Sequence, residues 1–272
     1  LWGGNVDVTL VERNASFVSC PISNLVLGGH KQMSDITVSY AGLEAAGVKR
    51  IRGEVVAIDP QAKEVRLADG RKLPYDRVIV SPGVDFMLDQ IGGLATPAAQ
   101  EKFLHGWKAG PQTVALRRQL EAMPDGGVYA LSIPVAPYRC PPGPYERACQ
   151  VAWYFKRAKP KSKVLVLDGN PDVTSKAGLF KKAWNDLYKG IVEYRPNHVL
   201  TDVDLATKTA KFETADDVRA SVLNVIPPHH GGGLARTAGV ITANNRGREV
   251  DFLSHESIRG KGVHVLGDSI QI

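Results

Sequence analysis

The sequence has few cysteines, few aromatic residues and no long apolar run. Its 272 residues include 3 cysteines, and aromatic side chains make up 7% of the chain. So few scattered cysteines exclude a disulfide-rich scaffold, and none belongs to a C-x-x-C pair or a zinc-binding pattern. No apolar run approaches the roughly 18 residues that cross a bilayer. We therefore expect no metal site and no membrane span.

Blocks of charge of one sign are also missing. The chain carries 34 Lys and Arg against 28 Asp and Glu, a net charge of +6 without a basic cluster or a basic-aromatic alternation. This argues against nucleic-acid binding, and an acidic protein partner explains the charge equally well. With 43% hydrophobic residues, the chain can build a sizeable core as one large domain or two medium ones.

The first clear strand signal runs from Val6 to Glu12 and ends in an acidic residue. In a dinucleotide-binding βαβ unit the second strand ends in such an acid, whose carboxylate accepts hydrogen bonds from a ribose. The same pattern also fits an ordinary strand end. On the first interpretation, the first strand and the glycine-rich phosphate loop would precede Leu1. We therefore expect the chain to be part of a longer protein.

Strands and helices then alternate. A helix is predicted at 42–48, a strand at 50–59, a hairpin around Asp69-Gly70, and a buried strand at 76–80 that runs into Pro82-Gly83. This order of elements is typical of two-domain flavoproteins of the glutathione-reductase type.

A second set of elements follows a looser stretch at 86–110. Strand 127–133, helix 144–158 and strand 163–168 form a βαβ unit, for which we expect parallel strands and a right-handed connection. The remaining predicted elements are helices at 112–122 and 177–188, a strand near 191–195, a hairpin at 199–213, a strand at 221–226, and a last strand at 262–268 that ends in Gly267-Asp268.

The loop at 137–146, of sequence PYRCPPGPYE, carries the most informative chemistry. It lies at a strand-to-helix turn where pyridine-nucleotide enzymes have glycines, and its four prolines remove N–H donors that a pyrophosphate would need. We therefore expect no NAD(P)H site in the second domain. Cys140 stands shortly before the helix N-terminus and beside Arg139, and both features favour the thiolate form.

Three residues are candidates for redox chemistry. Cys140 suits attack on sulfur or a redox disulfide, or it is a spacer in a rigid turn. Glu146 suits proton transfer, or it is an ordinary first-turn acid of a helix. Cys20 follows Glu12 closely and suits flavin contact or attachment, or it is a structural cysteine. Cys149 lies among apolar helix residues and is interpreted as a core residue.

Together these segments resemble the flavoprotein subunit of flavocytochrome c sulfide dehydrogenase, a relative of the sulfide:quinone oxidoreductases. The resemblance extends over essentially the whole chain. Its most specific segments are 17–24 followed by Gly28-Gly29, the run RCPPGPYERA at 139–148, Trp107-Lys108-Ala109-Gly110, and His264-Val265-Leu266-Gly267-Asp268.

The resemblance implies an α/β fold of two Rossmann-like, dinucleotide-binding-type domains of the glutathione-reductase-like kind. Residues 1–100 and 227–272 would be the two parts of the FAD-binding domain, and 101–226 the NADH-domain-like domain that carries the redox cysteine. The N-terminal first strand with its phosphate loop, and the C-terminal region, would be missing from this chain.

The resemblance also implies a redox site. FAD would be attached covalently through its 8α-methyl group to Cys20, and Cys140 would be half of a redox disulfide near the flavin, with Glu146 beside it. Sulfide would attack the disulfide, and two electrons would pass to the flavin and then singly to a c-type haem subunit. The residues implied for FAD are Glu12 at the adenosine ribose, Val56 and Ala57 beside the adenine, Pro82 and Gly83 along the cofactor, and Asp268 at its ribityl or pyrophosphate region.

The implied function is flavin-dependent oxidation of sulfide or a related sulfur species, with a c-type cytochrome as partner and a periplasmic location. One alternative is a sulfide:quinone oxidoreductase, and another is a catalytically inactive fragment or binding module that keeps the fold. The sequence departs from the family at Arg246-Gly247-Arg248, where relatives have a Trp-Cys pair. The partner cysteine of Cys140 would follow Ile272.

Overall fold

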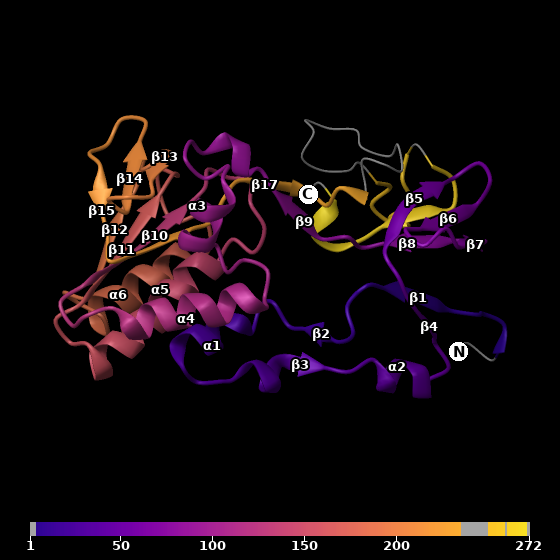
Figure 1. The fold of residues 1–272 in the computed structure, drawn as a ribbon, viewed down its shortest axis with the longest axis horizontal. Coiled ribbons are helices and arrows are strands. Elements are labelled where there is room, and N and C mark those ends of the chain that lie inside the picture. The colour runs from indigo at the N-terminus through magenta and orange to yellow at the C-terminus, as the bar shows by residue number, and fades with distance from the viewer. Residues whose placement is uncertain (1–3, 235–249, 259, 271–272) are drawn as a thin grey trace. The chain divides into compact units, whose positions relative to one another are not determined.

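A computed structural model describes residues 4–234, 250–258 and 260–270 of the chain. The chain divides into two compact units (Figure 1). Unit 1 comprises Leu1–Phe17, Val38–Phe86 and His229–Ile272, and unit 2 comprises Val18–Thr37 and Met87–Pro228. The segment at 246–248, where the sequence departs from the family, lies outside the described residues.

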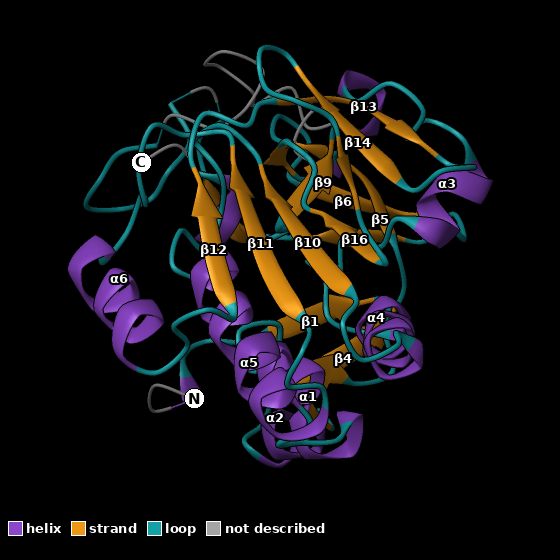
Figure 2. Ribbon diagram, turned by 90° about the vertical axis from the view of Figure 1, so that its left-hand side faces the viewer, coloured by secondary structure: helices purple, strands orange, loops and turns teal. Residues whose placement is uncertain are grey.

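Unit 2 is built on a four-stranded parallel sheet (Figure 2). Three of its strands are apolar and mostly buried, as expected for a parallel sheet covered on both faces, whereas the edge strand at 192–195 is half-buried and contains charged residues. The two inner strands, on either side of the Pro-rich loop and its helix, are paired in parallel, so the predicted βαβ unit is confirmed. In spatial order the strands are β12 (Val192–Arg195), β11 (Lys163–Asp168), β10 (Val128–Ile133) and β16 (Val222–Val225).

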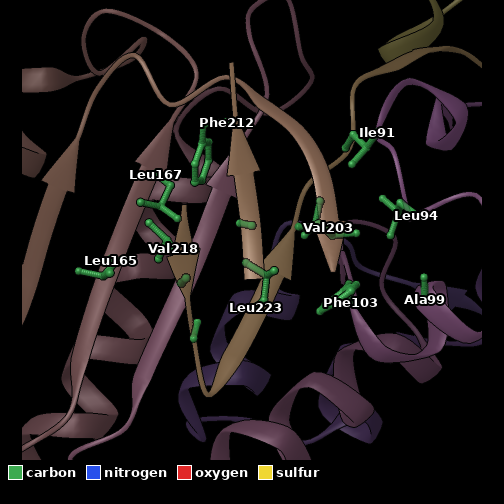
Figure 3. Packing of buried hydrophobic residues seen from close by; sticks show 14 residues of the cluster. Ile91, Leu94, Ala99, Phe103, Leu165, Leu167, Val203, Phe212, Val218 and Leu223 are labelled. Carbon is green, nitrogen blue, oxygen red and sulfur yellow. The ribbon is translucent and has the colours of Figure 1, made fainter. Parts of the chain in front are cut away.

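One face of this sheet packs against a second, three-stranded antiparallel sheet. Leu165, Leu167 and Leu223 of the central sheet share a buried core with Val203 and Phe212 of the second sheet (Figure 3). The second sheet consists of β13 (Leu200–Asp204), β14 (Thr209–Phe212) and β15 (Val218–Arg219), and α3 (Pro97–Lys102) and the 3-10 helix η3 (Leu88–Gln90) add to the same core.

Helices of unit 2 lie on the other face, which the alternate strand residues Tyr129 and Val166 line. The central helix is α5 (Gly143–Ala158), with Pro144 at its start, Glu146 in its first turn and basic residues in its last turn, as the sequence predicted. The other helices of the unit are α1 (Ser23–Gly28), α4 (Pro111–Ala122), α6 (Ala177–Asp186) and the 3-10 helix η2 (Met33–Ile36).

Unit 1 is made of short strands around a small core that includes Ile58, Leu67 and Val263. Two strand pairs are parallel, β1 (Thr9–Glu12) with β4 (Lys49–Arg52) and β8 (Val78–Val80) with β18 (Val263–Val265). The antiparallel parts are the meander of β5 (Val55–Asp59), β6 (Glu64–Leu67) and β7 (Lys72–Pro74), and the pair of β9 (Val84–Phe86) with β17 (His229–Gly231). The unit also contains α2 (Ala41–Ala45) and the 3-10 helix η4 (Gly267–Ser269). Two further short strands, β2 (Phe17–Val18) and β3 (Thr37–Val38), lie where the chain passes from one unit to the other.

Two details of unit 1 bear on the prediction. The hairpin around Asp69-Gly70 is confirmed, and Gly70 adopts a positive φ of 87° that favours glycine at this turn. The strand predicted at 50–59 is instead two strands, because Gly53 interrupts it. The N–H of Gly53 donates to the carbonyl of Glu12, which closes the β1–β4 pair, and the chain then enters the separate meander.

Candidate active site

The Pro-rich loop places Cys140 at the carboxyl end of β10, directly before α5. This is the edge of a parallel sheet where α/β proteins bind their ligands. Cys140 is exposed, has a positive φ of 56°, and its carbonyl accepts a hydrogen bond from the N–H of Gly143 at 2.8 Å. A methyl group added at Gly143 would come within 2.9 Å of both Cys140 Sγ and Trp107 Cη2. Only glycine therefore lets the Cys140 thiol and the Trp107 ring both lie against the first turn of α5.

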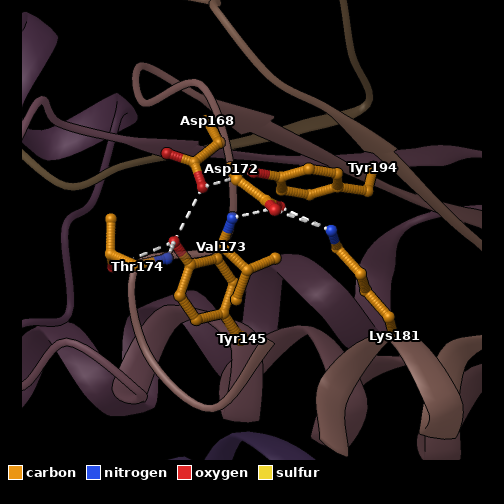
Figure 4. Close-up of polar contacts among 7 residues, drawn as sticks. All are labelled: Tyr145, Asp168, Asp172, Val173, Thr174, Lys181 and Tyr194. Carbon is orange, nitrogen blue, oxygen red and sulfur yellow. Dashed lines mark hydrogen bonds and ion pairs between the residues drawn. The ribbon is translucent and has the colours of Figure 1, made fainter. Parts of the chain in front are cut away.

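Hydroxyl groups on both sides of Cys140 anchor this loop. The Tyr138 and Tyr145 hydroxyls are 3.2 Å apart, and both contact Thr174 Oγ1, at 2.6 and 3.2 Å. The Tyr145 hydroxyl also donates to Asp168 Oδ2 at 2.7 Å (Figure 4). Burial raises the pKa of Tyr145 and of Tyr138, so both hydroxyls keep their protons at neutral pH. The Cys140 loop is thus fixed to the end of β11.

Asp168 ends the second strand of this βαβ unit, the position at which a pyridine-nucleotide enzyme has its ribose-binding acid. Here the residue is fully buried. Its Oδ2 accepts from the hydroxyls of Tyr145 and Tyr194 (Figure 4). Its Oδ1 accepts from the backbone N–H and side-chain amide of Asn170. Asp168 therefore accepts four hydrogen bonds from within unit 2, and the expectation that this unit holds no NAD(P)H stays a prediction.

Trp107 links the two candidate cysteines. The Cys20 thiol donates to the Trp107 carbonyl at 3.0 Å, and Cys20 is itself exposed. The indole ring of Trp107 is buried and lies with Cys140 Sγ against Gly143. Two residues that are 120 positions apart in the sequence therefore flank one buried tryptophan. No local pattern in the sequence indicated this arrangement.

Glu146 joins the same cluster through Asn24. The Asn24 amide group donates to Glu146 Oε2 at 3.0 Å and to the Gly143 carbonyl at 3.2 Å. The Asn24 Oδ1 atom accepts from Arg147 Nε at 3.0 Å. Asn24 thus orients the Glu146 carboxylate while it holds the first turn of α5. The structure therefore brings together three of the predicted site residues, Cys20, Cys140 and Glu146, all within unit 2.

Arg147 is the principal site residue that the sequence analysis missed. It is 1% exposed, and its guanidinium donates to the carbonyls of His105 and Gly106, each at 2.7 Å, and to Asn224 Oδ1 at 2.9 Å, besides Asn24. Its Cζ lies 5.0 Å from the centroid of the Trp107 ring. The available signal was its position, because an arginine among the apolar residues of a helix is buried only for a specific partner.

The predicted adenosine residues lie in unit 1. Glu12 ends β1, and its Oε1 accepts from the backbone N–H and the side-chain amide of Asn14, both at 2.7 Å. Val56 and Ala57 lie on β5, where Val56 is exposed and Ala57 half-buried. Among the described residues, no hydrogen bond connects these three residues with the other cofactor residues predicted in unit 1.

The remaining cofactor residues of unit 1 converge on one turn. The Gly83 carbonyl accepts from the Gly232 N–H at 2.8 Å and from Ser269 Oγ at 2.6 Å. This brings Pro82-Gly83 next to η4, which contains the exposed Asp268. Gly83 and Gly267 have positive φ values of 70° and 71°, and a methyl group added at either would meet nothing within 4 Å. Two stretches of open backbone thus lie beside Asp268.

Other features of the molecule do not contribute to this site. Cys149 is half-buried in α5, and burial raises the pKa of its thiol. Among the described residues, no group of three His, Cys, Asp or Glu side chains is placed to hold a metal ion, and no helix is long and apolar enough to cross a membrane. A cavity of about 650 Å³ lies at the opposite, amino-terminal ends of β10 and β16, and its lining contains none of the predicted site residues.

Comparison with known proteins identifies relatives of this chain. Residues 113–227 match the model of the central region of the sulfide dehydrogenase (flavocytochrome c) flavoprotein chain. The mitochondrial sulfide:quinone oxidoreductase of Dictyostelium discoideum is 22% identical over 97% of this chain and 59% of its own length. That of Mus musculus is 24% identical over 83% of this chain and 51% of its own length. The chain resembles these flavoproteins, as the sequence predicted.

Solved structures show the same fold. The sulfide:quinone oxidoreductase of Aquifex aeolicus superposes with a TM-score of 0.80 at 18% identity, over 98% of this chain and 63% of that one. The NAD-dependent persulfide reductase of A. fulgidus gives a TM-score of 0.73 at 15% identity, over 98% and 49% of the two chains. The predicted α/β class with Rossmann-like units is confirmed. The chain spans 51% to 59% of the length of the two curated relatives.

Proposed function

We propose that the full-length protein oxidises sulfide, or a related inorganic sulfur species, at Cys140 and passes the electrons through FAD to a c-type cytochrome. The observation that carries this proposal is the cluster in unit 2. An exposed cysteine and a buried arginine both lie beside Trp107, with a second cysteine bonded to the Trp107 carbonyl and a carboxylate oriented by Asn24. The family resemblance supplies the substrate.

The residues of this chain fit an FAD cofactor. The open backbone at Gly83 and Gly267 suits a group that packs directly against the main chain, and Glu12 has a carboxylate oxygen, Oε2, that is not used by Asn14. Glu12 would hold the adenosine ribose, Val56 and Ala57 would flank the adenine, and Pro82, Gly83 and Asp268 would line the rest. When bound, the flavin accepts electron pairs and releases single electrons.

Cys140 would supply the sulfur that sulfide attacks. Because the residue is exposed and lies before a helix N-terminus, a small anion can reach it and its thiolate is favoured. Attack by HS⁻ on Cys140 in a disulfide forms the Cys140 persulfide and releases the partner cysteine as a thiolate. Glu146, held by Asn24, would accept the proton of the persulfide.

Cys20 would attach the flavin covalently. The purified full-length protein should be yellow, and the colour should stay with the precipitate after acid denaturation. The Cys20→Ser variant should instead release its flavin to the supernatant, while Cys149→Ser, the matched control, should retain it. Flavin released from the unaltered protein by acid would contradict the attachment.

The electron acceptor separates two enzymes. The curated relatives are sulfide:quinone oxidoreductases, so a quinone is the second candidate acceptor. The test compares sulfide-dependent reduction of a soluble cytochrome c with that of a short-chain quinone by the same preparation. We expect the cytochrome to be reduced faster, and faster reduction of the quinone would contradict the cytochrome proposal.

A cytochrome partner and a periplasmic location belong together in this proposal. The net charge of +6 would steer an acidic cytochrome surface, so its reduction rate should fall as salt is added. A rate that does not change with salt would remove this part of the proposal. Cell fractionation that locates the native protein outside the periplasm would contradict the location.

A further inference from the structure

Arg147 is a buried cation whose hydrogen-bond partners, among the residues that the structure describes, include no carboxylate. Its four hydrogen bonds all end on neutral oxygens, namely two backbone carbonyls and the amide oxygens of Asn24 and Asn224. Burial of a charge in a low-dielectric interior is unfavourable unless an opposite charge compensates it. Burial lowers the pKa of Arg147, but a guanidinium stays protonated in proteins. The charge is therefore kept at a cost to stability.

The groups that act on Arg147 electrostatically are Tyr129, Cys20, Cys140 and Glu146. Tyr129 is fully buried, and burial raises the pKa of its hydroxyl, so it remains neutral. Glu146 is bonded to Asn24 and not to the guanidinium itself. Of these four groups, the two thiols are the ones that can add negative charge during a reaction, and both belong to exposed residues.

The helix geometry directs this charge to Cys140. Gly143 and Arg147 are four residues apart on α5 and therefore lie on one face, a turn apart. Cys140 Sγ rests against Gly143, and the Trp107 ring lies against both Gly143 and the Arg147 guanidinium. The buried Trp107 ring thus contacts both the region of the cation and the region of the sulfur, and charges interact more strongly in such apolar surroundings than in water.

We propose that Arg147 is the positioning residue of this site, whose buried guanidinium holds the Cys140 sulfur as a thiolate and fixes Glu146 through Asn24. The thiol proton leaves to solvent, since Cys140 is exposed. This proposal rests on the proposed function only in taking Cys140 as the reacting sulfur. The Glu146 carboxylate has the opposite effect to Arg147 on the Cys140 sulfur, because a negative charge disfavours a nearby thiolate.

The test is the pH profile of Cys140 alkylation in the reduced full-length protein, measured by iodoacetamide labelling and mass spectrometry of the digest. Other charged or titratable groups near the sulfur are Arg139, Tyr138 and Cys20. In the unaltered protein, we expect the Cys140 thiol to be alkylated at lower pH than an ordinary cysteine, whereas burial raises the pKa of the Cys149 thiol in the same digest. An ordinary or raised value for Cys140 overturns the proposal without any variant.

Two changes, each of which removes one charge, then separate charge from structure. Arg147→Gln should slow Cys140 alkylation at pH 6.5 by roughly three- to sevenfold, the loss of thiolate expected when the thiol pKa rises by about one unit. Glu146→Gln should accelerate it, because a negative charge is lost. If Arg147 had only a structural role, Arg147→Gln and Glu146→Gln would not change the rate of Cys140 alkylation in opposite directions. Changes of the rate in the same direction therefore contradict the proposal.

Failure of the proposed function has a different signature. If sulfide does not reduce the flavin but Arg147→Gln still shifts the alkylation profile, the sulfide chemistry is wrong and the role of Arg147 stands. If sulfide reduces the flavin and the profile does not shift, the proposed role of Arg147 is wrong. Rescue by Arg147→Lys, which keeps the charge, should return part of the alkylation rate.

Discussion

Each unit contains a parallel strand that ends in an acidic residue, and the two acids have opposite surroundings. Glu12 of unit 1 is half-exposed, and within the described part of the chain its side chain accepts hydrogen bonds only from the nearby Asn14. Asp168 of unit 2 is fully buried and accepts four, from Tyr145, Tyr194 and Asn170. The same topological position thus remains available to a cofactor in unit 1, whereas in unit 2 it has become a support for the Cys140 loop.

The largest expected effect comes from removing each acid in turn. Asp168→Ala leaves the hydroxyls of Tyr145 and Tyr194 without their acceptor in a buried site and should lower the free energy of unfolding by about 3 kcal/mol. Glu12→Ala, the matched change in unit 1, should lower it by no more than about 0.5 kcal/mol. Urea unfolding followed by tryptophan fluorescence measures both. Equal losses would remove the distinction between the two acids.

Two glycine substitutions, one at the Cys140 loop and one on α6, test how closely the loop is packed. Gly143→Ala forces Cys140 Sγ or the Trp107 ring to move, since both would lie 2.9 Å from the new methyl group, and should cost about 1–2 kcal/mol of unfolding free energy. Gly178→Ala on the exposed α6 has no atom within 4 Å and should be neutral or slightly stabilising. A neutral Gly143→Ala would show that the loop is not tightly fitted.

A cofactor titration sharpens the comparison at Glu12. In a Cys20→Ser protein, where FAD binds without a covalent bond, Glu12→Gln should weaken FAD binding about tenfold, or about 1.4 kcal/mol, through loss of a charged acceptor for the ribose. Flavin fluorescence quenching measures the affinity. The exposed Asp7→Asn, just before β1, is the control and should leave the affinity unchanged.

A binding titration with NADH in place of FAD tests the account of Asp168. Because Asp168 is enclosed, we expect no saturable NADH binding, and NADH that protects unit 2 against unfolding would contradict this account.

The smallest effect is expected at the periphery of the Asp168 network. Lys181 pairs with Asp172 at 2.6 Å, on side chains that are 44% and 57% exposed (Figure 4). Such exposed pairs are screened by solvent, so Lys181→Ala should leave the urea midpoint unchanged. A clear loss of stability would mean that the network extends to the surface and that Asp168 depends on it.

Local patterns predicted the elements better than their assembly. Apolar runs and the charge placement along α5 predicted the βαβ unit, because these signals lie within one strand or helix. The separation of β4 from β5 at Gly53 was missed, since it depends on pairing with the distant β1. The assignment of 18–37 to unit 2 likewise follows from packing of α1 against α4 and α5.

The candidate site shows the same limit. Cys140 and Glu146 could be predicted because the Pro-rich loop and the helix start are local features. Asn24, Trp107 and Arg147 could not, because their contacts within the site join residues 36 to 123 positions apart. Glu12 was indicated by its place at a strand end, and Val56 and Ala57 followed from the family resemblance. Of the cofactor residues predicted in unit 1, the described structure groups Pro82, Gly83 and Asp268.

The most direct test of the central claim is sulfide-dependent reduction of the flavin in the full-length protein, followed by the loss of its visible absorbance under anaerobic conditions. Cys140→Ser should retain its flavin and lose this reduction, while Cys149→Ser, in the same helix region, should be reduced at the rate of the unaltered protein. A Cys140→Ser protein whose flavin is reduced by sulfide at the normal rate would contradict the claim that Cys140 is the reacting sulfur.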